Sequence, residues 1–348
     1  MCSNRATPAG FAVFLRALLL VIPLLACWPS VQAQPTTLQE LEPDTIVVTG
    51  RRPGPRMWKV GKEDHVLWIF GLLTPLPRRM EWDSSRVAEV LLAADEYLSS
   101  ENADWSPQVP KALRVNPDKQ RLEGVLPADS WSHYIDFVRE NFGRDKDVET
   151  LRPMLAISTM QSLMYSRHDL VHAGRVMNEI NALARQNRGL KRTSVDFRLP
   201  EDLKIALDAR FIAALSSLTL EQETACFDAG LDRVMPNINL NKLSANAWAN
   251  GEIAELDYLM SLRSKEVNRL SLDDDPEDPC TFFLLDEVLR QGTNAFQAEV
   301  EERWLAEIDR ALNENGSTFM VLGMQELFRE DGVLQRLRER GYEVRVPE

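Results

Sequence analysis

The sequence predicts an α/β (α+β) fold. Two strand–glycine turn–helix units, one near each end of the chain, are expected to form a mixed sheet, with a long helical insertion between them. Two apolar runs, HVLWIFG (65–71) and STFMVLG (317–323), have the length of buried strands, and each ends in a glycine before a helix-like segment. Between these runs, apolar residues recur mainly three or four positions apart, which indicates helices. A last short run, YEVRV (342–346), predicts a final strand.

The first 33 residues have the pattern of a secretory signal peptide. Arg5 and Arg16 precede the apolar run 17–28, which is too short to span a bilayer, and Ala33 is a small residue at a cleavage position. We therefore expect an exported, periplasmic protein cut after Ala33. In an alternative interpretation, LLAC (24–27) is similar to a bacterial lipobox and leaves Cys27 as a lipid-anchored N-terminus. No later segment predicts a transmembrane helix.

The folded domain is predicted over residues 57–348, after an extended arm (34–56) rich in Pro, Thr and charge. WKV (58–60) and the first apolar run are separated by the charged stretch GKED (61–64), which predicts a β-hairpin. After the Pro-rich turn, Ser84 or Ser85 can cap a helix. Its apolar positions recur at helical spacing: Val87, Val90, Leu91, Ala94 and Leu98.

The helical insertion is predicted over about residues 125–300. Two of its segments, 221–235 and 241–262, show apolar residues three or four apart, and one strand candidate, TSVDFRL (193–199), interrupts the helices. The stretch DDDPEDP (273–279) predicts a solvated loop, because Pro and clustered carboxylates oppose a helix and the central Gly and closing Glu of an EF-hand are missing.

The closing part of the chain returns to an α/β order. EVEERWLAEIDRALNE (299–314) predicts a helix, and DGVLQRLRERG (331–341) predicts a second helix that ends at Gly341. Together with the strands at 317–323 and 342–346, this second helix forms a predicted βαβ unit, whose connection we expect to be right-handed.

Charge and cysteine content restrict the class of function. A formal net charge of −13 disfavours binding to nucleic acid or to anionic lipid headgroups. Signal-peptide cleavage would leave two cysteines, Cys226 and Cys280, and in an exported chain such a pair predicts a disulfide that contributes about 2–4 kcal/mol. Two buried free thiols are the alternative.

The two glycine turns carry polar residues at matching positions. In FGLLTPLP (70–77), Gly71 ends the strand and Thr74 follows at the third position; in LGMQELFREDG (322–332), Gly323 and Glu326 have the same spacing. Side chains at the carboxyl edge of an α/β sheet point to the crevice where such proteins bind ligands. The two turns are therefore the predicted site.

At these residues the sequence resembles the TraB/GumN family, whose members include metal-dependent Tiki-type proteases. WKVGKEDHVLWIFGLLTPLPRRMEW (58–82) is similar to the family's opening segment, with its Trp-Lys-Val hairpin, Gly turn and Leu-Pro. STFMVLGMQELFREDGVLQRLRERGYEV (317–344) is similar to its closing segment, and NAWANGEIAEL (246–256) to part of its helical insertion. The resemblance covers residues 57–348 and is strongest at the two ends.

The resemblance implies two Gly-x-x-His motifs whose histidines bind a divalent metal. In this chain Thr74 and Glu326 stand at the two histidine positions. A Glu that the family carries after the first helix aligns with Ser100, and Glu101 follows one place later. A Thr hydroxyl is a poor ligand for zinc or cobalt compared with imidazole. A weaker magnesium- or calcium-like site through Glu326 and Glu101 is the alternative.

The pair His168 and His172 offers another possible ligand set. In HDLVH (168–172) the spacing i, i+4 would place both imidazoles on one face of a helix, as in the zinc-protease motif His-Glu-x-x-His. Asp169, however, is shorter than the catalytic Glu, and the pair falls at a predicted helix end, which favours a structural or surface role.

These observations predict an exported TraB/GumN-like protein without metal-dependent hydrolysis and without a cofactor, which uses its cleft to bind a protein or small-molecule partner. The alternative is an active metal-dependent hydrolase or peptidase that holds Mn, Co or Zn through a rearranged ligand set of Glu326, Glu101 or the His168/His172 pair.

Overall fold

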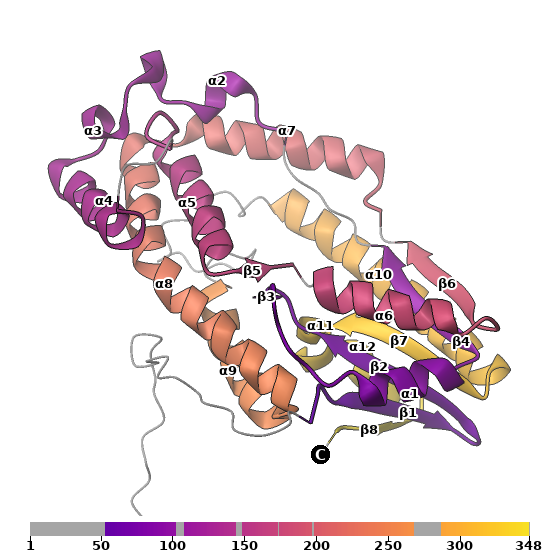
Figure 1. Cartoon of the computed structure of the whole chain (residues 1–348). Helices are drawn as coiled ribbons and strands as arrows, with labels where there is room; N and C mark the ends of the chain where they lie inside the picture. The colour runs from indigo at the N-terminus through magenta and orange to yellow at the C-terminus, as the bar shows by residue number, and fades with distance from the viewer. Residues whose placement is uncertain are drawn as a thin grey trace, which may run out of the picture. The chain divides into compact units, whose positions relative to one another are not determined.

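A six-stranded mixed sheet is the framework of the molecule (Figure 1). The computed structural model describes residues 53–101, 108–143, 148–172, 174–196, 198–267 and 287–347, which belong to one compact unit of the chain. The strand order in the sheet is β6-β4-β7-β2-β1-β8. The strands, in chain order, are β1 (Met57–Lys62), β2 (His65–Leu72), β4 (Glu96–Glu101), β6 (Lys191–Asp196), β7 (Ser317–Gly323) and β8 (Glu343–Arg345).

Four neighbouring strands of the sheet run in the same direction. β2 pairs in parallel with β7, β7 with β4, and β4 with β6, whereas β1 is antiparallel both to β2 and to β8. The carboxyl ends of β2, β7, β4 and β6 therefore lie along one edge of the sheet, which we call the carboxyl edge. Parallel strands buried on both faces require helical crossovers, and the chain supplies them.

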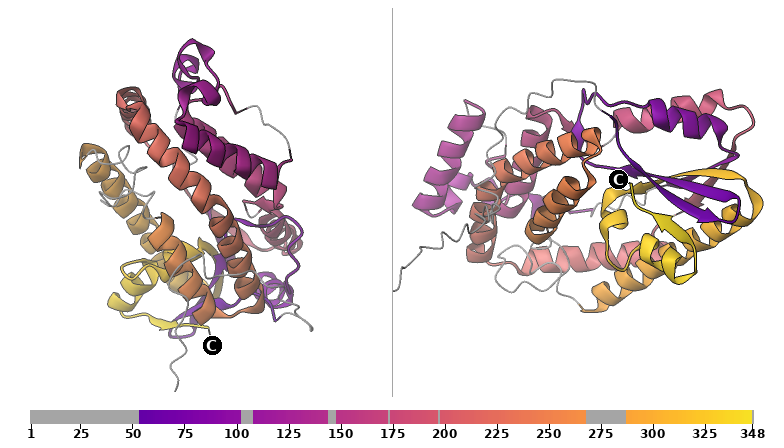
Figure 2. Two further views of the ribbon diagram at one scale, coloured as in Figure 1. Left: turned by 90° about the vertical axis from the view of Figure 1, so that its left-hand side faces the viewer. Right: turned by 90° about the horizontal axis from the view of Figure 1, so that it is seen from below.

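Helices cover both faces of the sheet (Figure 2). α1 (Ser85–Ala93) and α6 (Gly174–Gln186) pack against each other on one face, and α10 (Glu287–Glu314) packs against β2, β6 and β7 on the other. The strand side chains between them, such as Leu67, Ile69 and Phe319, are fully buried. These helices keep the apolar strands out of water, which is the main favourable contribution to folding.

A second hydrophobic core lies within the helical insertion. α4 (Ala128–Asn141) and α5 (Pro153–Arg167) pack against α8 (Leu220–Asn250) around Tyr134 and Phe227. Gly230 of α8 permits this close approach, because a Cβ there would lie 2.3 Å from a side-chain carbon of Ile157. Figure 1 shows α4 and α5 alongside α8.

α8 contributes side chains to both cores. Phe227 and Ile238 belong to the core of the helical insertion, whereas Leu240 and Trp248 belong to the core around the sheet. Thr219 caps the helix at its start through a reciprocal pair of hydrogen bonds with Gln222. The remaining elements are β3 (Leu76–Pro77), α2 (Lys111–Arg114), η2 (Pro117–Lys119), α3 (Leu122–Val125), β5 (Leu170–Val171), α7 (Glu201–Ser217), α9 (Ile253–Val267), α11 (Met324–Phe328) and α12 (Val333–Glu339). No helix within the described ranges has the length and apolarity needed to cross a bilayer.

Most of the predicted elements are confirmed. The hairpin forms with its turn at Glu63 and Asp64, and the strand candidate 193–199 corresponds to β6. The C-terminal strand is β8, which follows the two short helices α11 and α12. Gly341 has a φ of +85°, as expected for a glycine that ends a helix. The stretches 1–52 and 273–279 lie outside the described residues.

Several predicted boundaries are wrong. The helix after Ser84 ends at Ala93, so Leu98 belongs to strand β4, which the sequence analysis did not predict. The helices expected at 221–235 and 241–262 are instead divided at Gly251, which has a φ of +71°. α8 continues through Pro236, because packing on both sides of this position outweighs the hydrogen bond that a proline removes.

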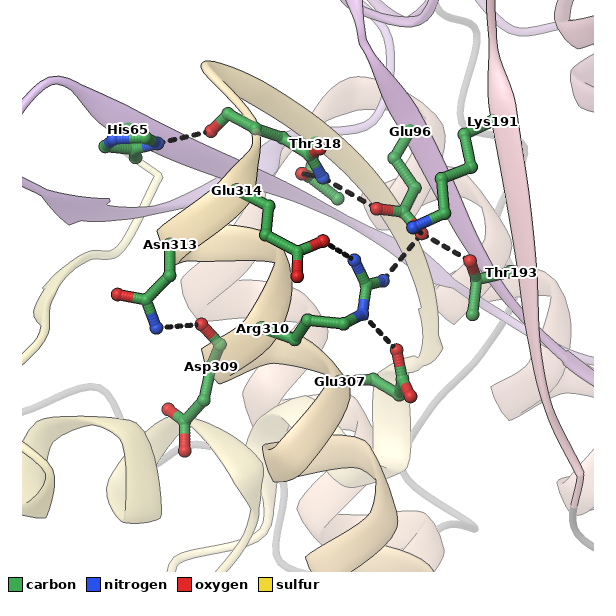
Figure 3. A network of polar contacts seen from close by, with 11 residues as sticks. His65, Glu96, Lys191, Thr193, Glu307, Asp309, Arg310, Asn313, Glu314 and Thr318 are labelled. Atoms are coloured by element: carbon green, nitrogen blue, oxygen red, sulfur yellow. Dashed lines mark hydrogen bonds and ion pairs between the residues drawn. The ribbon is translucent and has the colours of Figure 1, made fainter.

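Glu96, the first residue of β4, is a fully buried carboxylate at the opposite edge of the sheet (Figure 3). Arg310 of α10 donates to it over 2.7 Å and Asn315 over 2.6 Å, and the Thr193 hydroxyl and the Lys191 ammonium complete its surroundings. A buried charge is tolerated when it is paired and hydrogen-bonded in this way. The network joins β4 and β6 to the end of α10.

The pKa of Glu96 is lowered from the ordinary 4.5 to about 2. Burial by itself raises this pKa, but the hydrogen bonds from Arg310, Thr193 and Asn315 favour the ionised form more strongly. Because the pKa is lower in the folded state, Glu96 contributes its full stabilisation above about pH 4.5. That contribution is lost as the pH falls toward about 2.

Glu96→Gln is expected to lower the free energy of unfolding by about 3 kcal/mol at neutral pH, which corresponds to the size of the pKa shift. The variant should also lose less stability than the wild type between about pH 4.5 and about pH 2. Urea unfolding over this range checks both effects. Glu89→Gln, which removes an exposed carboxylate of α1 paired with Arg86, is the control and should cost less than about 1 kcal/mol. Equal acid sensitivity of Glu96→Gln and the wild type would contradict the assignment.

Candidate functional site

The carboxyl edge of the sheet is where the predicted site residues occur. Leu72 and Gly323 are paired at the ends of β2 and β7, and Glu101 and Asp196 are paired at the ends of β4 and β6. Thr74 follows β2 by two residues, and Glu326 is on α11, which begins directly after β7. The ends of β2, β7 and β6, which the sequence predicts, and of β4, which it does not, thus lie on one edge of the sheet. This is the position where α/β proteins bind ligands.

Gly71 permits α11 to pack closely against β2. A Cβ at this position would lie 2.2 Å from Met324 Sδ, 2.9 Å from Trp58 and 3.0 Å from Leu327. The indole N–H of Trp248 donates to the Gly71 carbonyl over 2.8 Å, in a buried setting. The first glycine turn is therefore held by α11 on one side and by α8 on the other.

Thr74 lies beside His172. Thr74 Oγ1 is 3.3 Å from His172 Nδ1, and both side chains are exposed. The contact follows from the pairing of β3 with β5, in which Leu76 lies opposite Val171. The backbone N–H of Arg78 also donates to the Asp169 carbonyl over 2.6 Å. A histidine distant in sequence is thereby brought to the Thr that occupies the first motif position.

His168 and His172 do not share a helical face. The sequence prediction that the pair falls at a helix end is confirmed, and the helical zinc arrangement that was its alternative does not form. α5 ends at Arg167, His168 caps it, and Asp169 has a φ of +56° that turns the chain into β5. His168 Nδ1 instead accepts a hydrogen bond from the Lys242 ammonium of α8 over 3.0 Å. The two imidazoles contact different partners, and their spacing is not that of a helical zinc motif.

Glu326 is engaged with Arg329. Arg329 Nη1 lies 2.9 Å from Glu326 Oε2, and the same guanidinium contacts Glu301 of α10 over 2.8 Å and Asp331 over 2.9 Å. Burial raises the pKa of Glu326. The nearby Arg329 lowers this pKa, and the carboxylates of Glu301 and Asp331 raise it further. The second motif position therefore holds a carboxylate that is already paired with a cation.

Asp196 is a carboxylate that sequence reasoning missed. It pairs in register with Glu101, so two acidic residues end neighbouring parallel strands at the carboxyl edge. The sequence does predict a strand at 193–199, which contains Asp196. Its position beside Glu101 could not be predicted, because β4, the strand that pairs with it, was not predicted. Among the side chains that the structure describes, which do not include those of Glu101 and Asp196, no group of three or more His, Cys, Asp or Glu is placed to hold a metal ion.

Comparison with known proteins gives the class of this chain. A model of the TraB/PrgY/gumN family matches residues 56–346, and the chain belongs to that family. The match covers both glycine turns and the whole helical insertion. No curated protein and no solved structure matches the chain significantly.

Gly71→Ala is expected to destabilise the fold by about 1–3 kcal/mol, because the added methyl group overlaps Met324 and Trp58. Gly323→Ala is the matched control. No described atom lies within 4 Å of a Cβ at Gly323, and its φ of −62° suits alanine, so this change should cost less than about 1 kcal/mol. Thermal or urea unfolding of the two variants compares the costs. A similar loss in both would show that the close packing at Gly71 does not require glycine.

Proposed function

We propose that this chain is an exported TraB/PrgY/gumN protein that binds a ligand or partner protein at the carboxyl edge of its sheet without metal-dependent hydrolysis. The observation that carries the proposal is the Glu326–Arg329 pair at the second motif position. A carboxylate that neutralises an arginine, beside the further carboxylates Glu301 and Asp331, would have to give up that pairing to bind a metal.

The first motif position supports the same conclusion. The Thr74 hydroxyl is neutral at physiological pH and does not replace an imidazole as a ligand for zinc, cobalt or manganese. The scaffold of the turn is nevertheless retained, since Gly71 packs against α11 and Trp248 binds its carbonyl. A rigid turn with exposed polar groups suits recognition of a ligand as well as catalysis.

A second candidate function is a metal-dependent hydrolase or peptidase with a rearranged ligand set. The position of His172 favours it, because this imidazole lies 3.3 Å from Thr74 Oγ1 and could replace the histidine that the first motif lacks. Glu101 and Glu326 would be its carboxylate partners. His168 is a less suitable ligand, because its Nδ1 already accepts from Lys242.

Metal analysis of the purified chain, after dialysis against Mn²⁺, Co²⁺ or Zn²⁺, separates the two functions. We expect less than stoichiometric metal in the wild type and a gain in the double variant Thr74→His/Glu326→His, which restores both imidazoles. Stoichiometric metal in the wild type that disappears in Glu326→Ala would overturn the proposal. Loss in His172→Ala, with retention in the control His168→Ala, would establish the second function instead.

Export is proposed from the N-terminal sequence, with cleavage after Ala33 or, alternatively, a lipid-carrying Cys27. The predicted disulfide belongs to the same proposal. Cys226 is buried in α8, and Cys280 lies outside the described residues.

Mass spectrometry of the mature protein under non-reducing conditions tests both points. We expect an N-terminus at Gln34 and a peptide that links Cys226 to Cys280, because an oxidising compartment favours the bond. An N-terminal lipopeptide that begins at Cys27 would establish the anchored form. Recovery of Cys226 and Cys280 as free thiols from exported protein would contradict the disulfide.

A further inference from the structure

Lys242 is a partly buried cation whose contact is an imidazole and not a carboxylate. Its ammonium lies 3.0 Å from His168 Nδ1, and within the described residues no Asp or Glu forms an ion pair with it. An ammonium can only donate, so Nδ1 accepts and the ring in this contact is unprotonated at that nitrogen. The Lys242 ammonium and the His168 imidazole are therefore in direct contact, with no described carboxylate paired to the ammonium.

Several partly buried arginines of this chain are paired with carboxylates. Arg310 contacts three carboxylates, Arg329 also contacts three, and Arg152 is paired with the buried Glu223. A chain with 53 acidic residues has many carboxylates to place near a cation. Lys242 instead resembles the half-buried Lys59 and Lys62, for which the described residues likewise show no ion pair with a carboxylate. Lys62 bonds to Asn313, and both lysines lie over aromatic rings. What sets Lys242 apart is that its contact is a titratable imidazole.

The pair is connected to the first glycine turn through α8 and β5. Lys242 is on α8, and Trp248, which binds the Gly71 carbonyl, lies about 9 Å further along the same helix. His168 directly precedes the turn into β5, the strand that pairs with β3 just after Thr74. A group bound at Lys242 and His168 would thus be held by the same two elements that position the first glycine turn.

The electrostatics of His168 agree with a site that lacks an anion. Burial lowers the pKa of His168, and the neighbouring Lys242 and Arg167 lower it further. Asp169 is the adjacent acid, and its carboxylate is directed to Arg78, with 3.8 Å between Oδ1 and Nε. An anion at the pair would offset the repulsion among these cations and would favour protonated His168.

We propose that Lys242 and His168 form a subsite for an oxyanion, a carboxylate or phosphate group of the ligand that binds at the carboxyl edge. Lys242 supplies a point charge, and His168 supplies a ring N–H, or two when protonated. The inference deepens the proposed function and rests on it for the location of the rest of the ligand. The subsite itself can be tested with simple anions.

The probes are sulfate, as a tetrahedral anion that stays charged, and acetate, as a carboxylate, each added to the full chain at constant ionic strength against chloride. The chain has four histidines, so the ring signals of ¹³C-labelled histidine can be assigned with single variants. We expect the His168 signal to shift toward the protonated position and to saturate with sulfate, acetate or both. The tighter of the two anions identifies the group that the ligand carries.

Lys242→Gln should weaken this binding by about tenfold or more, because a hydrogen bond to a charged group is lost, and Lys242→Arg should restore it. Lys111→Gln, which removes an exposed lysine of α2, is the matched control and should bind as the wild type does. Retained dispersion of the four histidine signals shows that each variant is folded.

Absence of a saturable shift in the wild type would overturn the subsite. An unchanged affinity in Lys242→Gln would do the same. Neither result depends on the metal analysis, so discovery of a stoichiometric metal would remove the proposed function and leave the subsite standing. Loss of the subsite would leave the proposed function untouched.

Discussion

The parallel pairing of β2 with β7 is the constraint on which the rest of the structure depends. It joins a strand near the start of the described chain to one near its end, with the whole helical insertion between them. Contacts between such distant segments carry a large entropic cost of closing the loop, so the interface must be well packed. Gly71 permits this packing, because the absence of a side chain lets Met324 and Leu327 of α11 approach β2 closely.

The chemistry at the carboxyl edge follows from how its charges are partnered. Arg329 contacts the carboxylates of Glu326 and Glu301 at the second turn. At the first turn the Thr74 hydroxyl lies next to the His172 imidazole, and in a separate contact the Lys242 ammonium donates to His168. At the second turn one guanidinium contacts three carboxylates, whereas the ammonium of Lys242 contacts an imidazole. The two turns therefore differ in charge: the second has more carboxylates than cations among its described contacts, and at the first Thr74 contacts an imidazole.

Local patterns in the sequence were sufficient to predict the strands at both ends of the chain and their glycine turns. They failed at β4, whose sequence EYLSSE starts with Glu96, because a glutamate normally lies in water. Glu96 can be buried because Thr193 of β6 and Arg310 of α10 hydrogen-bond to its carboxylate, and these partners are distant in sequence. The contact of Thr74 with His172 and that of His168 with Lys242 were likewise beyond prediction. Both arise from pairing between segments far apart in sequence, whereas the spacing within HDLVH suggested a single helix face.

α8 has a wider consequence because one continuous helix supplies side chains to two cores. Its last turns hold the Gly71 carbonyl, while its first half supports α4 and α5. The outer surfaces of α4 and α5 can thus accumulate substitutions without moving the carboxyl edge, provided that the buried face of α8 is kept.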